Sequence, residues 1–170
     1  LAEIVGNRDG FNASTMIWRR PGRQIEFGSA KDPGDEGSWK GRPHDLIAFD
    51  EVPDFLESQF RFLCGWNRTT IEDQRCRIVC TGNPPQTVDG RWVISYWAPW
   101  LDNKHPHPAQ PGELRWFTTV DGRDQEVDGP APITFEGEIL IPRSRTFIPS
   151  HVQDNPFLVA TGYISTLQAL

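Results

Sequence analysis

The stretch HDLIAFDEVPDF, residues 44–55, decides the fold, because a short apolar run ends directly in two acids. Residues 45–49 are typical of a strand that is buried on both faces of a parallel sheet. Residues 53–64 carry apolar side chains at helical spacing, and a proline is tolerated in the first turn. Residues 76–85, CRIVCTGNPP, repeat the strand-then-turn pattern. Strand, helix and strand in close succession predict a βαβ unit and therefore an α/β fold.

The sequence around this unit predicts three regions. An α/β core is expected over about residues 23–100, opening with a strand at 23–29 and a loop at 30–44 that is rich in glycine and proline. A hairpin and an extended segment are expected over about 101–150. Asp121-Gly122 is a hairpin turn signal between two strand-like halves. A terminal helix is expected over about 157–170, and Asp154 and Asn155 before Pro156 form a cap or turn.

Composition limits the classes of function. The net charge of −6 argues against a strongly basic nucleic-acid-binding domain. Cys64, Cys76 and Cys80 fit a reduced chain better than a disulfide scaffold, and Cys76 and Cys80 are interpreted as small apolar filler. No apolar run approaches the roughly 18 residues that span a bilayer, so we expect no membrane partner. The chain begins with a leucine, and its one methionine is Met16. We therefore expect it to be a piece of a longer polypeptide.

Asp50 and Glu51 are the strongest candidates for chemistry. Ligands of open α/β sheets bind beyond the carboxyl ends of the strands, which is where these acids are expected. In nucleotide hydrolases, the first acid of such a pair holds Mg²⁺ and the second orients and deprotonates the attacking water. The simpler alternative is that the two acids only flank a strand and complement a helix dipole.

The next strand ends in Thr81, Gly82 and Asn83. Hydroxyl and amide groups at the tip of a neighbouring strand can reach a γ-phosphate or the attacking water, and loss of the phosphate removes that contact. The alternative is a plain turn, which glycine, asparagine and proline all favour.

Four stretches together resemble the ATPase region of the large terminase subunit of tailed bacteriophages, the DNA-packaging motor. KGRPHDLIAFDE resembles the Walker B segment of that family, and CTGNPP resembles its coupling motif. DGRWVISYWAPWLDNKHPHPAQPGELRWF and TFIPSHVQDNPFL…GYISTLQAL are similar to the segments that follow. The resemblance covers about residues 40–170, and the two long stretches are its more specific part.

The resemblance implies part of a P-loop NTPase sheet of the ASCE type, parallel, with helices on its faces and an added antiparallel hairpin. It implies that Asp50 binds Mg²⁺, that Glu51 activates water for ATP hydrolysis, and that Thr81, Gly82 and Asn83 couple the nucleotide state to movement. The implied partners are double-stranded DNA, a portal protein, a small terminase subunit and further copies of the chain. The implied location is the cytoplasm of an infected or lysogenic bacterial host.

The sequence departs from the family in one large respect. No G-x-x-x-x-G-K-[ST] phosphate-binding loop occurs in the 170 residues. We expect that loop upstream and a nuclease domain downstream, and we expect this polypeptide alone to hydrolyse ATP poorly or not at all. Two other interpretations stay open. One is a fragment of a helicase-type P-loop ATPase, and the other is a non-enzymatic interaction module with a degenerate ATPase fold.

Other polar residues carry weaker hypotheses. His105 and His107 stand two apart, but prolines surround them, so a solvated loop is favoured over a metal site. Arg42, Arg143 and Arg145 are candidates for an arginine that stabilises transition-state charge, and no spacing selects one of them.

Overall fold

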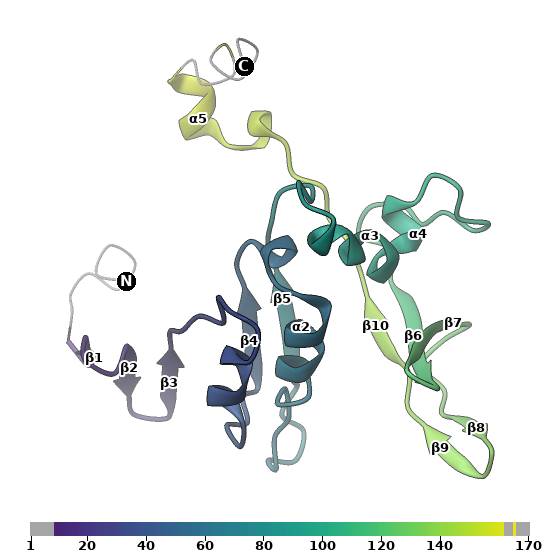
Figure 1. Ribbon diagram of the computed structural model, residues 1–170, viewed down its shortest axis with the longest axis horizontal. Coiled ribbons are helices and arrows are strands. Elements are labelled where there is room, and N and C mark those ends of the chain that lie inside the picture. Colours follow the sequence, from purple (N-terminus) through teal and green to yellow (C-terminus); the bar gives the residue numbers. More distant parts are fainter. Residues whose placement is uncertain (1–8, 162–164, 166–170) are drawn as a thin grey trace. The chain divides into compact units, whose positions relative to one another are not determined.

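The computed structural model describes residues 9–161 and residue 165 (Figure 1). The chain divides into two compact units, Leu1–Arg91 and Trp92–Leu170, each of which is described by itself. The division falls inside the span of about 23–100 that the sequence suggested for the core. The described part is mixed α/β with small sheets and short helices. None of its helices has both the length and the apolar character needed to cross a membrane.

Within its described residues, the first unit contains two sheets and one α-helix. Its elements are β1 (Phe11–Asn12), β2 (Ile17–Arg20), β3 (Arg23–Glu26), η1 (Asp35–Trp39), β4 (Leu46–Phe49), η2 (Val52–Asp54), α2 (Glu57–Cys64), β5 (Arg77–Cys80) and η3 (Asp89–Arg91). The strand predicted at residues 23–29 begins as expected and ends earlier, at Glu26. The predicted loop at 30–44 contains the 3₁₀ helix η1. Gly34, the residue directly before this helix, has a φ of 101°.

The βαβ prediction is confirmed. β4 and β5 pair in parallel, from Leu46 opposite Arg77 to Phe49 opposite Cys80, and α2 lies between them in the sequence. The predicted helix at 53–64 starts as the 3₁₀ turn η2, and the α-helical part begins at Glu57. The chain is extended at Phe55 and Leu56, which separates the two pieces.

One face of this parallel pair forms the core of the first unit. Phe49 at the end of β4 is buried and contacts Phe60 of α2, with ring centroids 5.0 Å apart. Phe55 packs edge-to-face against Phe49 at 5.3 Å. Aromatic rings packed in this way bury large apolar areas, so this cluster fixes α2 against the strands.

The prediction that residues 45–49 are buried on both faces is wrong in this structure. Leu46 is 53% exposed, and on the neighbouring strand Val79 is 49% exposed. Side chains alternate between the faces of a strand, so α2 covers the face of Phe49 while Leu46, Ala48 and Val79 lie on the other. The described residues contain only a two-stranded parallel sheet, not a full P-loop NTPase sheet.

The second unit is built on an antiparallel sheet in the order β10-β6-β7. Its elements are α3 (Trp92–Tyr96), α4 (Ala98–Leu101), β6 (Arg115–Val120), β7 (Arg123–Val127), β8 (Ile133–Phe135), β9 (Glu138–Leu140), β10 (Arg143–Arg145), η4 (Val152–Asp154) and α5 (Pro156–Ala160). The predicted hairpin is confirmed, because β6 and β7 join through Asp121 and Gly122, which both have positive φ. That backbone conformation matches the twist of a two-residue hairpin. β10, expected as extended chain, adds a third strand beside β6.

The terminal helix begins as expected. The Asn155 side chain accepts hydrogen bonds from the N–H groups of Phe157 (3.0 Å) and Leu158 (3.3 Å), which caps α5. Residues 162–164 and 166–170 of the predicted helix lie outside the described part of the chain.

Candidate functional site

The main chain holds the carboxyl ends of β4 and β5 together beyond the strands themselves. The Thr81 N–H donates to the Phe49 carbonyl at 2.9 Å, and the Val52 N–H donates to the Thr81 carbonyl at 2.8 Å. Residues 50–51 and 81–83 therefore meet at one edge of the sheet, where parallel strands present their ligand-facing ends. The five residues selected from the sequence are brought together here.

Asp50 follows β4 directly and is exposed. The Thr81 hydroxyl donates a hydrogen bond of 2.7 Å to Oδ1 of Asp50 and lies 3.4 Å from the Phe49 carbonyl oxygen. An ionised carboxylate offers about four acceptor positions, so one such bond leaves others for a cation or a water. Asp50 and Thr81 thus form an oxygen-rich pair at the rim of the sheet.

Glu51 adopts an unusual backbone conformation. Its φ of 50° and ψ of 54° lie in the left-handed region, which residues other than glycine seldom occupy. This conformation turns the chain sharply after β4 and leads into η2. Residues in such conformations are concentrated at ligand sites, because the surrounding structure has to hold them there.

Asn83 makes contacts with the Glu51 carboxylate from two directions. Its backbone N–H donates to Oε2 at 3.2 Å, and its side-chain amide donates to Oε1 at 3.3 Å. The two acids of the pair therefore have different partners, a hydroxyl for Asp50 and an amide for Glu51. Adjacent carboxylates held in this way can serve separate chemical roles.

Gly82 lies where the turn after β4 presses against the turn after β5. A Cβ atom at Gly82 would lie 2.6 Å from Cδ of Pro53 and 3.2 Å from the backbone nitrogen of Val52. Gly90 is similarly close, since a Cβ atom there would lie 2.4 Å from the Pro53 carbonyl oxygen. The glycine of the TGN sequence is thus required for close packing of the two turns.

The oxygen ligands at this edge of the sheet suit Mg²⁺ better than they suit a metal that is bound by protein side chains alone. Within the described residues, no group of three or more His, Cys, Asp or Glu side chains could hold a metal ion. Mg²⁺ keeps several water ligands and is usually bound through one or two carboxylates together with substrate phosphates. Asp50, with the hydroxyl of Thr81 beside it, supplies that kind of partial site.

The two histidines and Arg145 belong to the second unit and have partners within it. His105 lies 3.6 Å from Glu126, and its ring bonds to the His107 backbone, so both belong to the loop of the second unit. Arg145 is held in the second unit by Asp124 at 2.6 Å and by the Tyr96 carbonyl at 3.0 Å. These contacts give Arg145 a structural role.

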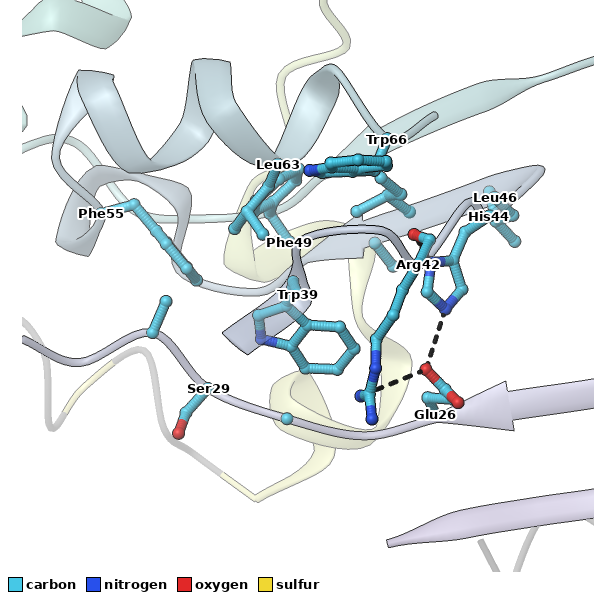
Figure 2. Close-up of a pocket in the computed structure, with 14 residues that line it drawn as sticks. Glu26, Ser29, Trp39, Arg42, His44, Leu46, Phe49, Phe55, Leu63 and Trp66 are labelled. Atoms are coloured by element: carbon cyan, nitrogen blue, oxygen red, sulfur yellow. Dashed lines mark hydrogen bonds and ion pairs between the residues drawn. The ribbon is translucent and has the colours of Figure 1, made fainter. Parts of the chain in front are cut away.

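A pocket in the first unit was not predicted from the sequence (Figure 2). Its volume is about 130 Å³, and aromatic side chains including Trp39, Phe55 and Trp66 line it. At one end the Glu26 carboxylate lies 3.1 Å from Nε2 of His44 and 3.8 Å from Arg42. Neither acid of the Asp50–Glu51 pair lines this pocket. It is smaller than the 300–1,000 Å³ or so that ligand sites of drug or cofactor size usually occupy.

Cys80 faces the interior side of β5. Burial raises the pKa of the Cys80 thiol to about 12, and Cys64 nearby adds to the rise. A thiol that stays protonated is a poor nucleophile, so this cysteine acts as the apolar filler expected from the sequence.

The comparisons with known proteins add no relative: no family model, no curated protein and no solved structure matches this chain.

Proposed function

We propose that the chain is the later part of the ATP-hydrolysing engine of a phage DNA-packaging terminase, which moves double-stranded DNA into a procapsid. The observation that carries the proposal is the meeting of Asp50 and Glu51 with Thr81 and Asn83 at the carboxyl edge of two parallel strands. The resemblance of the sequence to terminase motifs supports the choice of motor among P-loop ATPases.

In this proposal the two acids divide the work. Asp50, oriented by its hydrogen bond from the Thr81 hydroxyl, would take part in holding Mg²⁺. When bound, the metal offsets the negative charge on the β- and γ-phosphates of ATP. Glu51 accepts the proton of the attacking water, which requires its carboxylate to be reachable beyond its bonds to Asn83.

Thr81, Gly82 and Asn83 would link this chemistry to movement. Thr81 and Asn83 each touch one of the two acids, so a change at the γ-phosphate reaches the end of β5 through one side chain. Gly82 lets the following turn pack directly on Pro53. A displacement of the turn after β4 would therefore be transmitted to the turn after β5.

The complete engine needs groups that these 170 residues do not supply. A phosphate-binding loop is one, and the strands that would enlarge the two-stranded parallel pair into a P-loop NTPase sheet are another. The exposed apolar face of Leu46 and Val79 is a surface that such additional elements would cover. The portal protein, the small terminase subunit, further copies of the chain and action in the host cytoplasm belong to the same proposal.

The test uses the polypeptide encoded by the complete open reading frame. Glu51→Gln keeps the shape of the side chain and removes its ability to accept a proton, so Mg-ATP hydrolysis should fall by about 10²- to 10⁴-fold. Asp54→Asn is the matched control, because it makes the same acid-to-amide change at an exposed position in the same turn. Hydrolysis that is undiminished in the first variant, or equally reduced in both, would contradict the role of Glu51.

One observation favours the non-enzymatic alternative. Both acids already accept hydrogen bonds from Thr81 and Asn83, as they would in a site that only fastens two turns together. A complete polypeptide that neither binds nor hydrolyses Mg-ATP would support that alternative. Uptake of DNA into procapsids, in place of strand separation, distinguishes the terminase from a helicase-type ATPase.

A further inference from the structure

The pocket of the first unit has the size of a single aromatic ring. It lies between β4, α2 and the chain that leads from β3 to η1 (Figure 2). Its volume of about 130 Å³ is close to that of an engineered apolar cavity of about 150 Å³ that holds benzene. We propose that this pocket binds a phenol ring, either that of a small free phenol or that of a tyrosine side chain. The ATPase proposal is not needed for this, because neither Asp50 nor Glu51 lines the pocket.

The walls of the pocket are held in place by contacts outside it. The indole of Trp39 packs directly on the backbone of Gly28, where a Cβ atom would overlap the ring. The guanidinium of Arg68 lies over the ring of Trp66, 4.4 Å from its centroid. Walls supported in this way do not have to be ordered when a ligand enters. A preformed site of this kind avoids part of the entropic cost of binding.

The side chains around the pocket favour an aromatic ligand. Trp39, Phe55 and Trp66 supply aromatic surface, and Leu63 and Ile47 supply aliphatic surface. Aromatic rings attract one another when the edge of one meets the face of another, in addition to burying apolar area. A ring among these three aromatic side chains would make such contacts, and an aliphatic group of the same volume would not.

One end of the pocket is polar and carries a hydrogen-bond acceptor. The Glu26 side chain is only 12% exposed. Its Oε1 accepts a hydrogen bond from Gln24 at 2.8 Å, and its Oε2 lies 3.1 Å from Nε2 of His44. A carboxylate has about four acceptor positions, so Glu26 can accept a further bond from a ligand hydroxyl. Figure 2 shows this end at the opposite side of Trp39 from Phe55.

The charges at this end favour a neutral donor over an ion. Arg42 lies 3.8 Å from the Glu26 carboxylate and offsets part of its negative charge, which weakens the attraction for a cationic ligand. A ligand carboxylate would in turn be repelled by Glu26. The imidazole of His44 is fixed as a wall, because its Nδ1 lies 3.0 Å from the Arg42 carbonyl oxygen. A phenol, which has one neutral O–H donor on an aromatic ring, matches both ends of the pocket.

The experiment titrates the 170-residue chain with p-cresol and follows the backbone amide signals by NMR. Toluene is the comparison ligand, because it has the same ring and methyl group and lacks the hydroxyl. For a ligand of this size we expect a Kd of about 1 mM for p-cresol. Toluene should bind about tenfold more weakly, since it cannot donate a hydrogen bond to Glu26. The shifts should be concentrated at residues 28–30 and 46–49, which line the pocket.

Two pairs of variants test the two ends of the pocket. Glu26→Gln removes the charge of the acceptor, so p-cresol should lose most of its advantage over toluene. Glu72→Gln is the matched control at an exposed acid that does not line the pocket. Trp66→Leu should weaken the binding of both ligands several-fold. Trp100→Leu, the same change at a half-buried tryptophan of the second unit, should leave both affinities unchanged.

The ratio of the two affinities separates binding from folding. Partial unfolding of a variant lowers the apparent affinity for p-cresol and toluene equally, so it does not mimic the effect expected of Glu26→Gln. N-acetyltyrosinamide distinguishes the two sources of the ring. Binding at least as tight as that of p-cresol assigns a tyrosine side chain, and binding of p-cresol alone assigns a free phenol.

The proposal is overturned by any of four results. These are the absence of saturable shifts, shifts centred on residues that do not line the pocket, equal affinity for p-cresol and toluene, or the same affinity ratio in Glu26→Gln and Glu72→Gln. Loss of ATP hydrolysis in Glu51→Gln bears only on the ATPase proposal, so the two proposals fail independently.

Discussion

Asn83 binds the carboxylate of Glu51 with both its backbone N–H and its side-chain amide, at 3.2 and 3.3 Å. The two residues are 32 positions apart, and they meet because β4 and β5 pair in register up to Phe49 and Cys80. This contact therefore depends on the parallel pairing and reports on it.

The Asn83–Glu51 contact can be tested with a substitution that adds a negative charge at position 83. Asn83→Asp places a second carboxylate against Glu51, whereas Asn83→Ala only removes the amide. A typical hydrogen bond contributes about 0.5–1.5 kcal/mol, and solvent weakens even a bond to a carboxylate at this exposed site, so the alanine variant should lose about that much unfolding free energy or less. The aspartate variant should lose more, and urea unfolding followed by tryptophan fluorescence measures both. Equal stability of the two variants would show that Asn83 and Glu51 are not in contact.

Gly82→Ala should destabilise the first unit. The added methyl group would lie 2.6 Å from a ring carbon of Pro53, which cannot rotate away. Overpacking of this kind costs about 1–3 kcal/mol, and urea unfolding would show it. Gly37→Ala is the control, because a Cβ atom there meets nothing within 4 Å. If both variants unfold at the same urea concentration, the two turns do not pack closely.

Arg145→Ala should destabilise the second unit. The guanidinium lies 3.6 Å from the centroid of Tyr96 and 4.3 Å from that of Phe117, and it pairs with Asp124 at 2.6 Å. Removing one member of a largely buried ion pair costs about 3–5 kcal/mol. The exposed Arg143 two residues earlier is the control, and its replacement by alanine should change stability by less than about 0.5 kcal/mol. Thermal unfolding that does not separate the two variants would contradict this account of the second unit.

The buried thiol of Cys80 should lower the stability of the folded chain at alkaline pH. Burial raises the pKa of its thiol in the folded chain to about 12, above the ordinary value of 9.0. Between these values the unfolded chain releases the thiol proton and the folded chain keeps it, so the unfolding free energy falls as pH rises from 9 toward 12. Cys80→Ala should show a shallower decline over this window than Cys76→Ala. Parallel declines in urea titrations would show that the Cys80 thiol is accessible to solvent in the folded chain.

The βαβ unit could be predicted from the sequence because its signals are local. Each strand is an apolar run that ends in turn-forming residues, and the helix between them has the spacing of an amphipathic helix. The meeting of Asp50 and Glu51 with Thr81 and Asn83 follows from parallel pairing alone. The hairpin at Asp121-Gly122 was also encoded locally, by residues that tolerate positive φ.

The features that escaped prediction depend on contacts between distant residues. Glu26 and His44 are 18 positions apart, and no periodicity relates them. The requirement for glycine at position 82 becomes visible only when the Pro53 ring is placed beside it. The exposed face of Leu46 was misjudged because an apolar run does not reveal how many strands flank it.

The division of labour between Asp50 and Glu51 is tested most directly by measuring Mg-ATP binding and single-turnover hydrolysis together, in the polypeptide from the complete open reading frame. Glu51→Gln should bind Mg-ATP as the unsubstituted protein does and hydrolyse it about 10²- to 10⁴-fold more slowly. Asp50→Asn should lose the Mg²⁺ dependence of nucleotide binding as well as hydrolysis. Identical behaviour of the two variants, or full activity in either, would contradict the central claim.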